Sequence, residues 1–241
     1  RQATPADVSI MILGLEEVQK RELPALEQVF STDIMQEKLQ AIMRPGSDFS
    51  TAPANADADL KAMLRQAQDG GYKIETAEGM YFPVIDYSLY KRYQVAVTAD
   101  IAAYIDIMSA ESDQPPAKDA ALVIGWDELL RRAAAQEKFI TQYGNSVRLD
   151  AVHQLYNRYI TFVFYGANNT PLFDYEGSSL NTRAKRDYQA AVASGENSRL
   201  FKAVGDYLAI IAKNNDKLTA EVDQFRKSAV ASLTASSGSL K

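Results

Sequence analysis

The sequence predicts an all-α protein: a single multi-helix bundle of about eight or nine helices with one small β-hairpin inserted near residues 72–85. Three observations lead to this prediction. Apolar residues recur at spacings of three and four through most of the chain, which is the period of an amphipathic helix. Capping residues, glycines and prolines divide these stretches into helix-length pieces. One segment, from Gly70 to Tyr93, breaks the helical period.

The composition is that of a folded, acidic protein. Of the 241 residues, 46% are hydrophobic and 24% are charged, which excludes wholesale disorder. We expect one domain over residues 1–241, with a weak candidate boundary at 112–118, where a short polar linker contains two prolines. The net charge of −5, without any basic run, argues against nucleic acid as a partner. No apolar run reaches the roughly 20 residues that span a membrane, so the chain is not expected to cross one.

The first half of the chain begins with helix signals. Thr4 is a predicted cap for a first helix, and Pro24 is predicted to open a second helix that pairs antiparallel with the first. One apolar face of the first helix is predicted from Val8, Met11, Ile12, Leu15 and Val18. A polar segment at 45–58 is predicted to be a loop, with acids that cap a short helix around 60–67.

The hairpin is predicted within the segment from Gly70 to Tyr93. Residues 72–76 alternate between apolar and polar types, and residues 80–85 return after a short turn, which is the pattern of two antiparallel strands. Pro83 cannot donate a hydrogen bond to a ladder, so the second strand is expected at an edge. A long helix that starts at Asp86 or Ser88 is then predicted to continue to about Glu111.

Five further helices are predicted in the second half of the chain. They are expected over 119–143, 146–165 and 182–193, from 198 to a break at 214–215, and over 218–233. Between the second and third of these lies another irregular segment, 166–180, and a Ser-rich tail follows residue 234. Irregular segments as long as 166–180 are often binding loops in compact domains.

Both irregular segments concentrate tyrosines and acids. Five of the 13 tyrosines fall between residues 70 and 93, close to carboxylates. A tyrosine offers an apolar ring and a polar hydroxyl, which suits a sugar, a peptide or a cation, but it equally suits the edge of a core with the hydroxyl in water. The candidate ligand-binding residues are Glu78, Tyr81, Asp86, Tyr87, Asp174, Tyr175 and Glu176. If the two segments meet in space, these residues form one acidic, aromatic pocket.

The sequence has little of the chemistry that cofactors and metals require. It contains no cysteine and one histidine, His153, which removes thiol chemistry and the common zinc, copper and iron–sulfur sites. The acids at 55–59 are not a calcium loop, because Leu60 and Gln66 stand where a glycine and an acid are required. Ser88 and Lys91 match the Ser-x-x-Lys motif of penicillin-binding enzymes, but the other motifs of those enzymes are absent from the sequence. We therefore predict no catalytic residue, no cofactor and no metal.

These observations favour a non-catalytic helical module, extracytoplasmic or on the cell surface. We expect it to bind a small ligand, a glycan or a peptide through residues 72–93 and 166–180. One alternative is a hydrolase of cell-wall material that uses paired carboxylates in the same segments. Another is a structural or protein-interaction bundle. The absence of cysteine favours export, although the composition also suits the cytoplasm.

Overall fold

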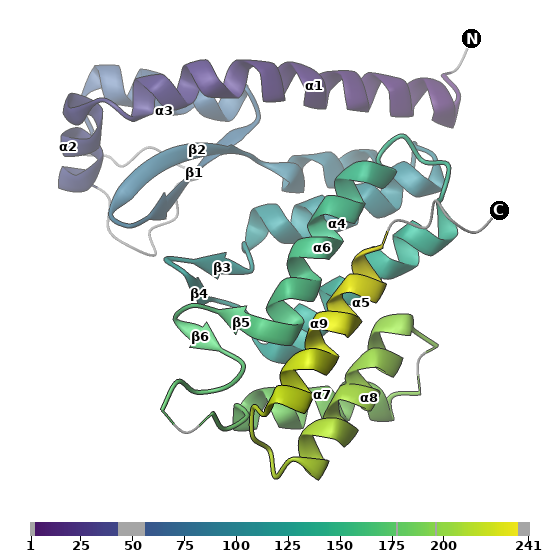
Figure 1. The fold of residues 1–241 in the computed structure, drawn as a ribbon. Coiled ribbons are helices and arrows are strands. Elements are labelled where there is room, and N and C mark those ends of the chain that lie inside the picture. Colours follow the sequence, from purple (N-terminus) through teal and green to yellow (C-terminus); the bar gives the residue numbers. More distant parts are fainter. Residues whose placement is uncertain (1–2, 43–55, 177, 196, 236–241) are drawn as a thin grey trace. The chain divides into compact units, whose positions relative to one another are not determined.

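The computed structural model describes residues 3–42, 56–176, 178–195 and 197–235 (Figure 1). These residues are mostly helical, with three small two-stranded antiparallel sheets, which confirms the predicted all-α fold with an inserted hairpin. Most of the predicted loop at 45–58 and of the predicted tail after residue 234 lies outside the described residues.

The chain separates into two compact units, Arg1–Asp113 and Gln114–Lys241. The division falls inside the segment 112–118, which contains the two prolines of the linker. The single domain over 1–241 stays a prediction.

The first unit contains four α-helices, one 3₁₀-helix and one hairpin among its described residues. In chain order they are α1 (Pro5–Phe30), α2 (Asp33–Ile42), α3 (Ala58–Asp69), β1 (Tyr72–Ala77), β2 (Met80–Ile85), η1 (Tyr87–Tyr93) and α4 (Ala99–Asp113). The α3 helix is capped as predicted, because the carboxylate of Asp57 accepts the backbone N–H of Leu60 at 2.8 Å.

Helix α1 begins as predicted and continues further than predicted. The Thr4 hydroxyl accepts the backbone N–H of Asp7, and the Asp7 carboxylate accepts that of Thr4, which completes a capping box. The predicted break at Pro24 is wrong. Pro24 lies inside α1, where its ring removes one backbone hydrogen bond, and the packing of Phe30, which is fully buried, holds the last turns in place.

The predicted apolar face of α1 is also corrected. Ile12 is buried, whereas Met11, Leu15 and Val18 are exposed. The face that packs on the first unit includes the buried residues Ser9, Ile12, Glu16, Gln19 and Phe30. The inward face is therefore partly polar, and much of the apolar face points to solvent.

The hairpin of β1 and β2 forms where the sequence predicts it. The strands pair in register from Tyr72 opposite Ile85 to Ala77 opposite Met80. Glu78 and Gly79 both have positive φ, 51° and 75°, as a type I′ turn requires. Each strand of a two-stranded ribbon has one unpaired edge, so Pro83 fits without the loss of a central ladder bond.

The predicted long helix over 86–111 is wrong in its first half. Asp86 caps only the short 3₁₀-helix η1, and α4 starts at Ala99. A tertiary contact sets this start: the backbone N–H of Thr98 donates to the hydroxyl of Ser9 on α1 at 2.9 Å. The aromatic and β-branched residues before position 99 have low helix propensity, so this contact decides where the helix begins.

The second unit contains five α-helices and two short hairpins among its described residues. In chain order they are β3 (Ala117–Lys118), β4 (Ala121–Leu122), α5 (Trp126–Gln142), α6 (Leu149–Tyr165), β5 (Gly166–Ala167), β6 (Thr170–Pro171), α7 (Thr182–Ala193), α8 (Arg199–Lys213) and α9 (Ala220–Thr234). The predicted helix over 119–143 starts only at Trp126. Asp119 and Ala120 instead adopt positive φ values of 50° and 58° and make the turn between β3 and β4.

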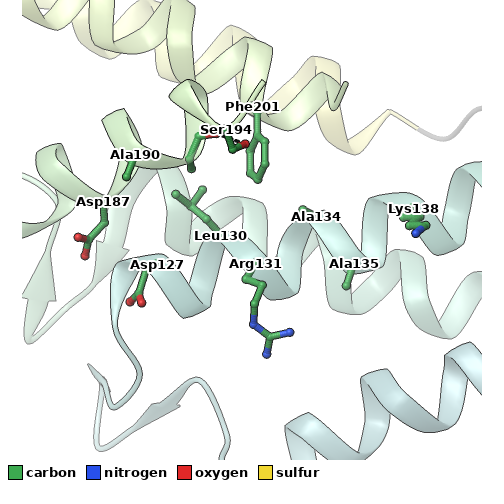
Figure 2. A pocket seen from close by; sticks show the side chains of 11 residues that line it. Asp127, Leu130, Arg131, Ala134, Ala135, Lys138, Asp187, Ala190, Ser194 and Phe201 are labelled. Carbon is green, nitrogen blue, oxygen red and sulfur yellow. Dashed lines mark hydrogen bonds between the residues drawn. The ribbon is translucent and has the colours of Figure 1, made fainter. Parts of the chain in front are cut away.

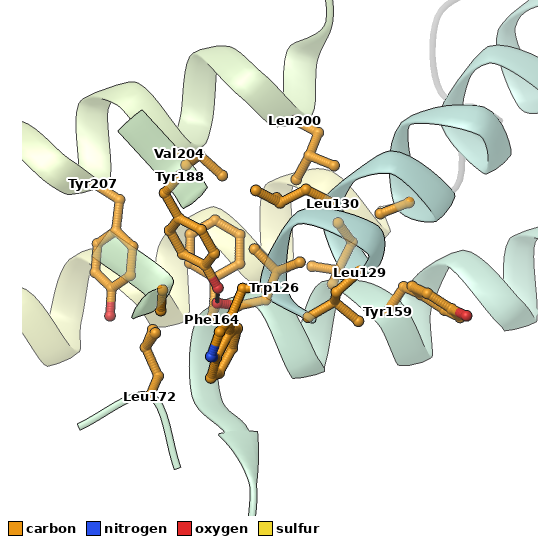
Figure 3. Close-up of a cluster of buried hydrophobic side chains, with 14 of the residues drawn as sticks. Trp126, Leu129, Leu130, Tyr159, Phe164, Leu172, Tyr188, Leu200, Val204 and Tyr207 are labelled. Atoms are coloured by element: carbon orange, nitrogen blue, oxygen red, sulfur yellow. Dashed lines mark hydrogen bonds between the residues drawn. The ribbon is translucent and has the colours of Figure 1, made fainter. Parts of the chain in front are cut away.

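The helices of the second unit pack around one aromatic core (Figure 3). Trp126 of α5 meets the ring of Tyr188 of α7 edge to face, with centroids 5.9 Å apart. The Tyr188 hydroxyl donates to the carbonyl of Val163 on α6 at 2.5 Å, so α5, α6 and α7 meet at one side chain. This core fixes the separation of α5 and α7.

Candidate functional site

The predicted ligand-binding residues of the first unit divide into exposed acids and buried tyrosines. Glu78 lies exposed in the hairpin turn, and Asp86 accepts the backbone N–H of Ser88 as the cap of η1. Tyr81 is 5% exposed. Its backbone N–H donates to the side-chain oxygen of Gln36, and its backbone carbonyl accepts from the side-chain nitrogen of Gln36. Tyr87 is 6% exposed. The two tyrosine rings therefore pack inside the unit.

Glu16 of α1 is the carboxylate that accepts hydrogen bonds from the buried tyrosines Tyr87 and Tyr104. The hydroxyls of Tyr87 and Tyr104 both donate to Glu16 Oε1 at 2.5 Å, and the ammonium of Lys20 lies 2.9 Å from the same oxygen. Burial by itself raises the pKa of the Glu16 carboxyl, but the hydrogen bonds from Tyr104, Tyr87 and Lys20 outweigh it and hold the pKa below its ordinary value. The carboxylate is thus buried in its charged form.

Gln19 continues this network one turn along α1. Its side-chain carbonyl accepts the hydroxyl of Tyr90, and its backbone carbonyl accepts that of Tyr72 at 2.8 Å. Its amide nitrogen donates to the carbonyl of Gly70 at 2.8 Å. The tyrosine cluster of the predicted segment therefore joins α1 to the hairpin, η1 and α4. Of the three polar residues on the inward face of α1, Glu16 and Gln19 were the signal for this network in the sequence.

This buried carboxylate makes a pH-dependent contribution to stability. A carboxyl whose pKa is lower in the folded than in the unfolded protein stabilises the fold above its unfolded pKa, and this contribution is lost as the pH falls through the folded pKa. We expect the stability of the first unit to fall below pH 4.5, the ordinary pKa of Glu16, and to fall less steeply in Glu16→Gln. Urea unfolding followed by amide exchange of α1, from about pH 6 to about pH 3, measures the difference. Parallel curves for the two proteins would contradict it.

The predicted residues of the second unit lie together in one exposed loop. Tyr175 is 77% exposed, and its hydroxyl donates to the carbonyl of Asn168 at 2.8 Å. Asp174 accepts the backbone N–H of Ser179, and Glu176 faces solvent. Because these residues and those of 72–93 belong to different units, the pocket shared by the two segments stays a prediction.

A pocket of about 410 Å³ lies in the second unit among α5, α7 and the start of α8 (Figure 2). Its apolar lining comes from Leu130, Ala134, Ala135, Ala190, Ala191 and Phe201. Charged groups also line it: Asp127, Arg131 and Lys138 from α5 and Asp187 from α7. The α5 positions follow one another at three- and four-residue spacing and so share one helix face. Small alanines on both helices leave the space open.

Two of the four charged side chains that line the pocket, Arg131 and Asp187, have a partner of opposite charge. Arg131 donates twice to Glu128, from Nε and Nη2, each at 2.6 Å, and its guanidinium holds the pKa of that carboxyl below its usual range. Asp187 pairs with Arg186 at 2.8 Å. Lys138 forms no hydrogen bond or ion pair with the residues that the structure describes. An uncompensated ammonium therefore stands at one end of the pocket.

The neighbouring acid, Glu137, does not neutralise Lys138, because it is used elsewhere. Its two carboxylate oxygens accept the Ser198 hydroxyl at 2.5 Å and the backbone N–H of Leu200 at 3.0 Å. These bonds cap the N-terminus of α8, and α8 carries Phe201 to the pocket wall. No local pattern in the sequence marks this site, because its lining comes from separate helices.

The described residues contain no group of three or more His, Asp or Glu side chains that could hold a metal ion. Nor does any described helix have the length and apolarity to cross a bilayer. His153 lies half-buried on α6. Comparison of the chain with protein-family models, with curated proteins and with solved structures found no match. Function is therefore inferred from the residues of this chain alone.

Proposed function

We propose that this protein is a non-catalytic ligand-binding module whose site is the pocket of α5, α7 and α8. The observation that carries the proposal is an apolar pocket of about 410 Å³ with the unpaired ammonium of Lys138 at one end. This volume lies within the range of roughly 300–1,000 Å³ that is usual for small-molecule and peptide sites.

The chemistry of the lining favours a short peptide that ends in a large apolar residue with a free carboxylate. The alanines, Leu130 and Phe201 accept an apolar side chain. Lys138 offers an ammonium to the carboxylate, whereas Arg131 is already paired with Glu128. Of the ligand classes expected from the sequence, a glycan suits this lining least, because Phe201 is the one aromatic residue among the described lining residues.

The two irregular segments have unequal parts in this proposal. Tyr81 and Tyr87 are buried in the first unit, and the segment 72–93 supplies no lining residue of the pocket. Tyr175, with Asp174 and Glu176 on either side, is exposed and provides a candidate second contact for a longer peptide. An extracytoplasmic location, which the absence of cysteine favours, is part of the same proposal.

The test uses acetyl-Ala-Ala-Phe with a free carboxyl and its C-terminal amide as the probes. We expect the acid to shift the amide NMR signals of Ala134, Ala190 and Phe201, and Lys138→Glu to weaken its binding about tenfold, the usual value of a charge-assisted contact. The amide should bind wild type more weakly than the acid and should respond little to Lys138→Glu. Lys202→Glu is the matched control, because Lys202 is exposed on α8 outside the pocket lining.

A second pair of variants tests the apolar part of the site. Ala190→Leu fills the pocket and should abolish the shifts, whereas Ala193→Leu, at another exposed position of α7, should leave them unchanged. Shifts confined to other residues, or equal binding by both lysine variants, would contradict the proposal. Incubation of the protein with cell-wall fragments, followed by mass spectrometry, tests the hydrolase alternative, which requires those fragments to be cleaved.

A further inference from the structure

Helix α1 exposes an apolar surface on the side away from its own unit. Ile10, Met11, Leu15 and Val18 have exposed fractions of 69%, 58%, 40% and 44%. Together with Gly14 they cover one face of the first half of the helix, and we call these five residues the outer face of α1. A contiguous exposed apolar surface of this kind is typical of an interaction site.

Gly14 at the centre of the outer face is unexplained by the packing of the unit. A side chain added there would meet no atom of another element within 4 Å, among the residues described. A glycine in the middle of a helix has an entropic cost that alanine avoids. Met11, Gly14, Leu15 and Val18 stand at positions i, i+3, i+4 and i+7, which form the four sides of a hole for a side chain from another helix.

The charges around Gly14 are arranged for an antiparallel copy of the same helix. Asp7 lies seven residues before Gly14 and Arg21 seven residues after it, each about 10 Å along the axis. Both are exposed. The Asp7 carboxylate also accepts from Thr4 in the capping box, and Arg21 contacts its neighbour Glu22 at 3.0 Å, so each also has a partner within its own copy. If two α1 helices cross antiparallel at Gly14, each Asp7 faces the Arg21 of the other copy, and each Ile10 faces a Val18.

We propose that the outer face of α1 binds the outer face of a second copy, in a two-fold antiparallel crossing centred on Gly14. Such an interface is isologous, so every favourable contact occurs twice. One helix crossing covers less than the roughly 1,200–2,000 Å² of a standard stable interface, so we expect a dissociation constant in the micromolar range.

Sedimentation velocity of the full chain over a range of concentrations is the primary test. Wild type should dimerise, and Ile10→Lys should abolish association, whereas Glu27→Lys, on the opposite side of the same helix, should not change it.

Gly14→Ala should raise the melting temperature of the protein by about 2–4 °C, because alanine avoids the entropic cost of a glycine within a helix. The same substitution should weaken the dimer about tenfold, because the methyl groups of the two copies meet at the crossing. A merely structural glycine would not give these opposite effects.

Charge reversal tests the antiparallel orientation. Asp7→Arg and Arg21→Asp should each weaken self-association, and a mixture of the two variants should associate as a heterodimer, because both contacts are then complementary. A wild type that stays monomeric at millimolar concentration would overturn the proposal. So would a dimer that is indifferent to Ile10→Lys and Gly14→Ala, or a mixture that associates no better than its components.

Discussion

Glu16→Ala is expected to lower the free energy of unfolding of the first unit by about 3–5 kcal/mol, the usual cost of breaking a buried ionic network. The substitution removes the acceptor of two buried tyrosine hydroxyls, those of Tyr87 and Tyr104. Loss of the carboxylate acceptor costs about 1–3 kcal/mol for each hydroxyl, and the polar contacts of α1 with η1 and α4 at Glu16 are lost.

Amide hydrogen exchange of α1, followed by mass spectrometry at increasing urea concentration, measures this loss within the unit concerned. Glu16→Gln should have an intermediate effect, since it keeps the size of the side chain and one carbonyl acceptor. Glu17→Ala is the matched control, because that side chain is 60% exposed and its loss should cost less than about 0.5 kcal/mol. Equal effects of Glu16→Ala and Glu17→Ala would refute the assigned role of the network.

Gly166→Ala is expected to destabilise the second unit by about 3 kcal/mol or more, from backbone strain and overpacking together. Gly166 ends α6 with φ of 77° and ψ of −159°, a conformation that is essentially restricted to glycine. A methyl group there would lie 2.3 Å from the carbonyl oxygen of Thr170 and 2.7 Å from the backbone nitrogen of Leu172. Both atoms belong to the backbone, so the clash cannot be relieved by a side-chain rotation.

Gly195→Ala measures the cost of backbone strain at a positive φ without the steric clash that is present at Gly166. Gly195 also has a positive φ, 71°, but a methyl group there would meet no described atom within 4 Å. We expect it to cost about 1–2 kcal/mol, the penalty of the left-handed conformation alone. Urea unfolding followed by the fluorescence of Trp126, which is buried in the core of the second unit, compares the two variants. Equal losses would show that the close approach at Gly166 relaxes without cost.

The sequence predicted best those elements whose signals are local. The hairpin of β1 and β2 has its alternation and its turn residues within 14 positions, and α7 has its cap, Asn181, directly before it. Elements decided by distant contacts were predicted poorly. Pro24 lies inside a helix whose end is held by the packing of Phe30, and α4 starts at a contact with α1. In both places tertiary contacts outweigh the local helix propensity and the proline signal.

The candidate sites likewise depend on contacts between residues that are distant in the sequence. The concentration of tyrosines was visible in the sequence, but their acid, Glu16, is separated from Tyr87 by 71 positions and from Tyr104 by 88, and no local pattern links them. The pocket draws its lining from α5 and from the consecutive helices α7 and α8, which lie far from α5 in the sequence. Its alanines resemble core positions until the separation of α5 and α7 is known.

Glu16 and Gln19, on the inward face of α1, also select the rotation of that helix about its own axis. Successive residues of a helix are turned by about 100°, so a rotation by one residue would bring Gln19's neighbour Val18 and Glu16's neighbour Leu15 towards the unit. That rotation would bury more apolar surface, but it would deprive Tyr72, Tyr87, Tyr90 and Tyr104 of their acceptors. The tyrosines thereby exclude the orientation that hydrophobicity alone prefers, and they leave an apolar helix surface facing outward.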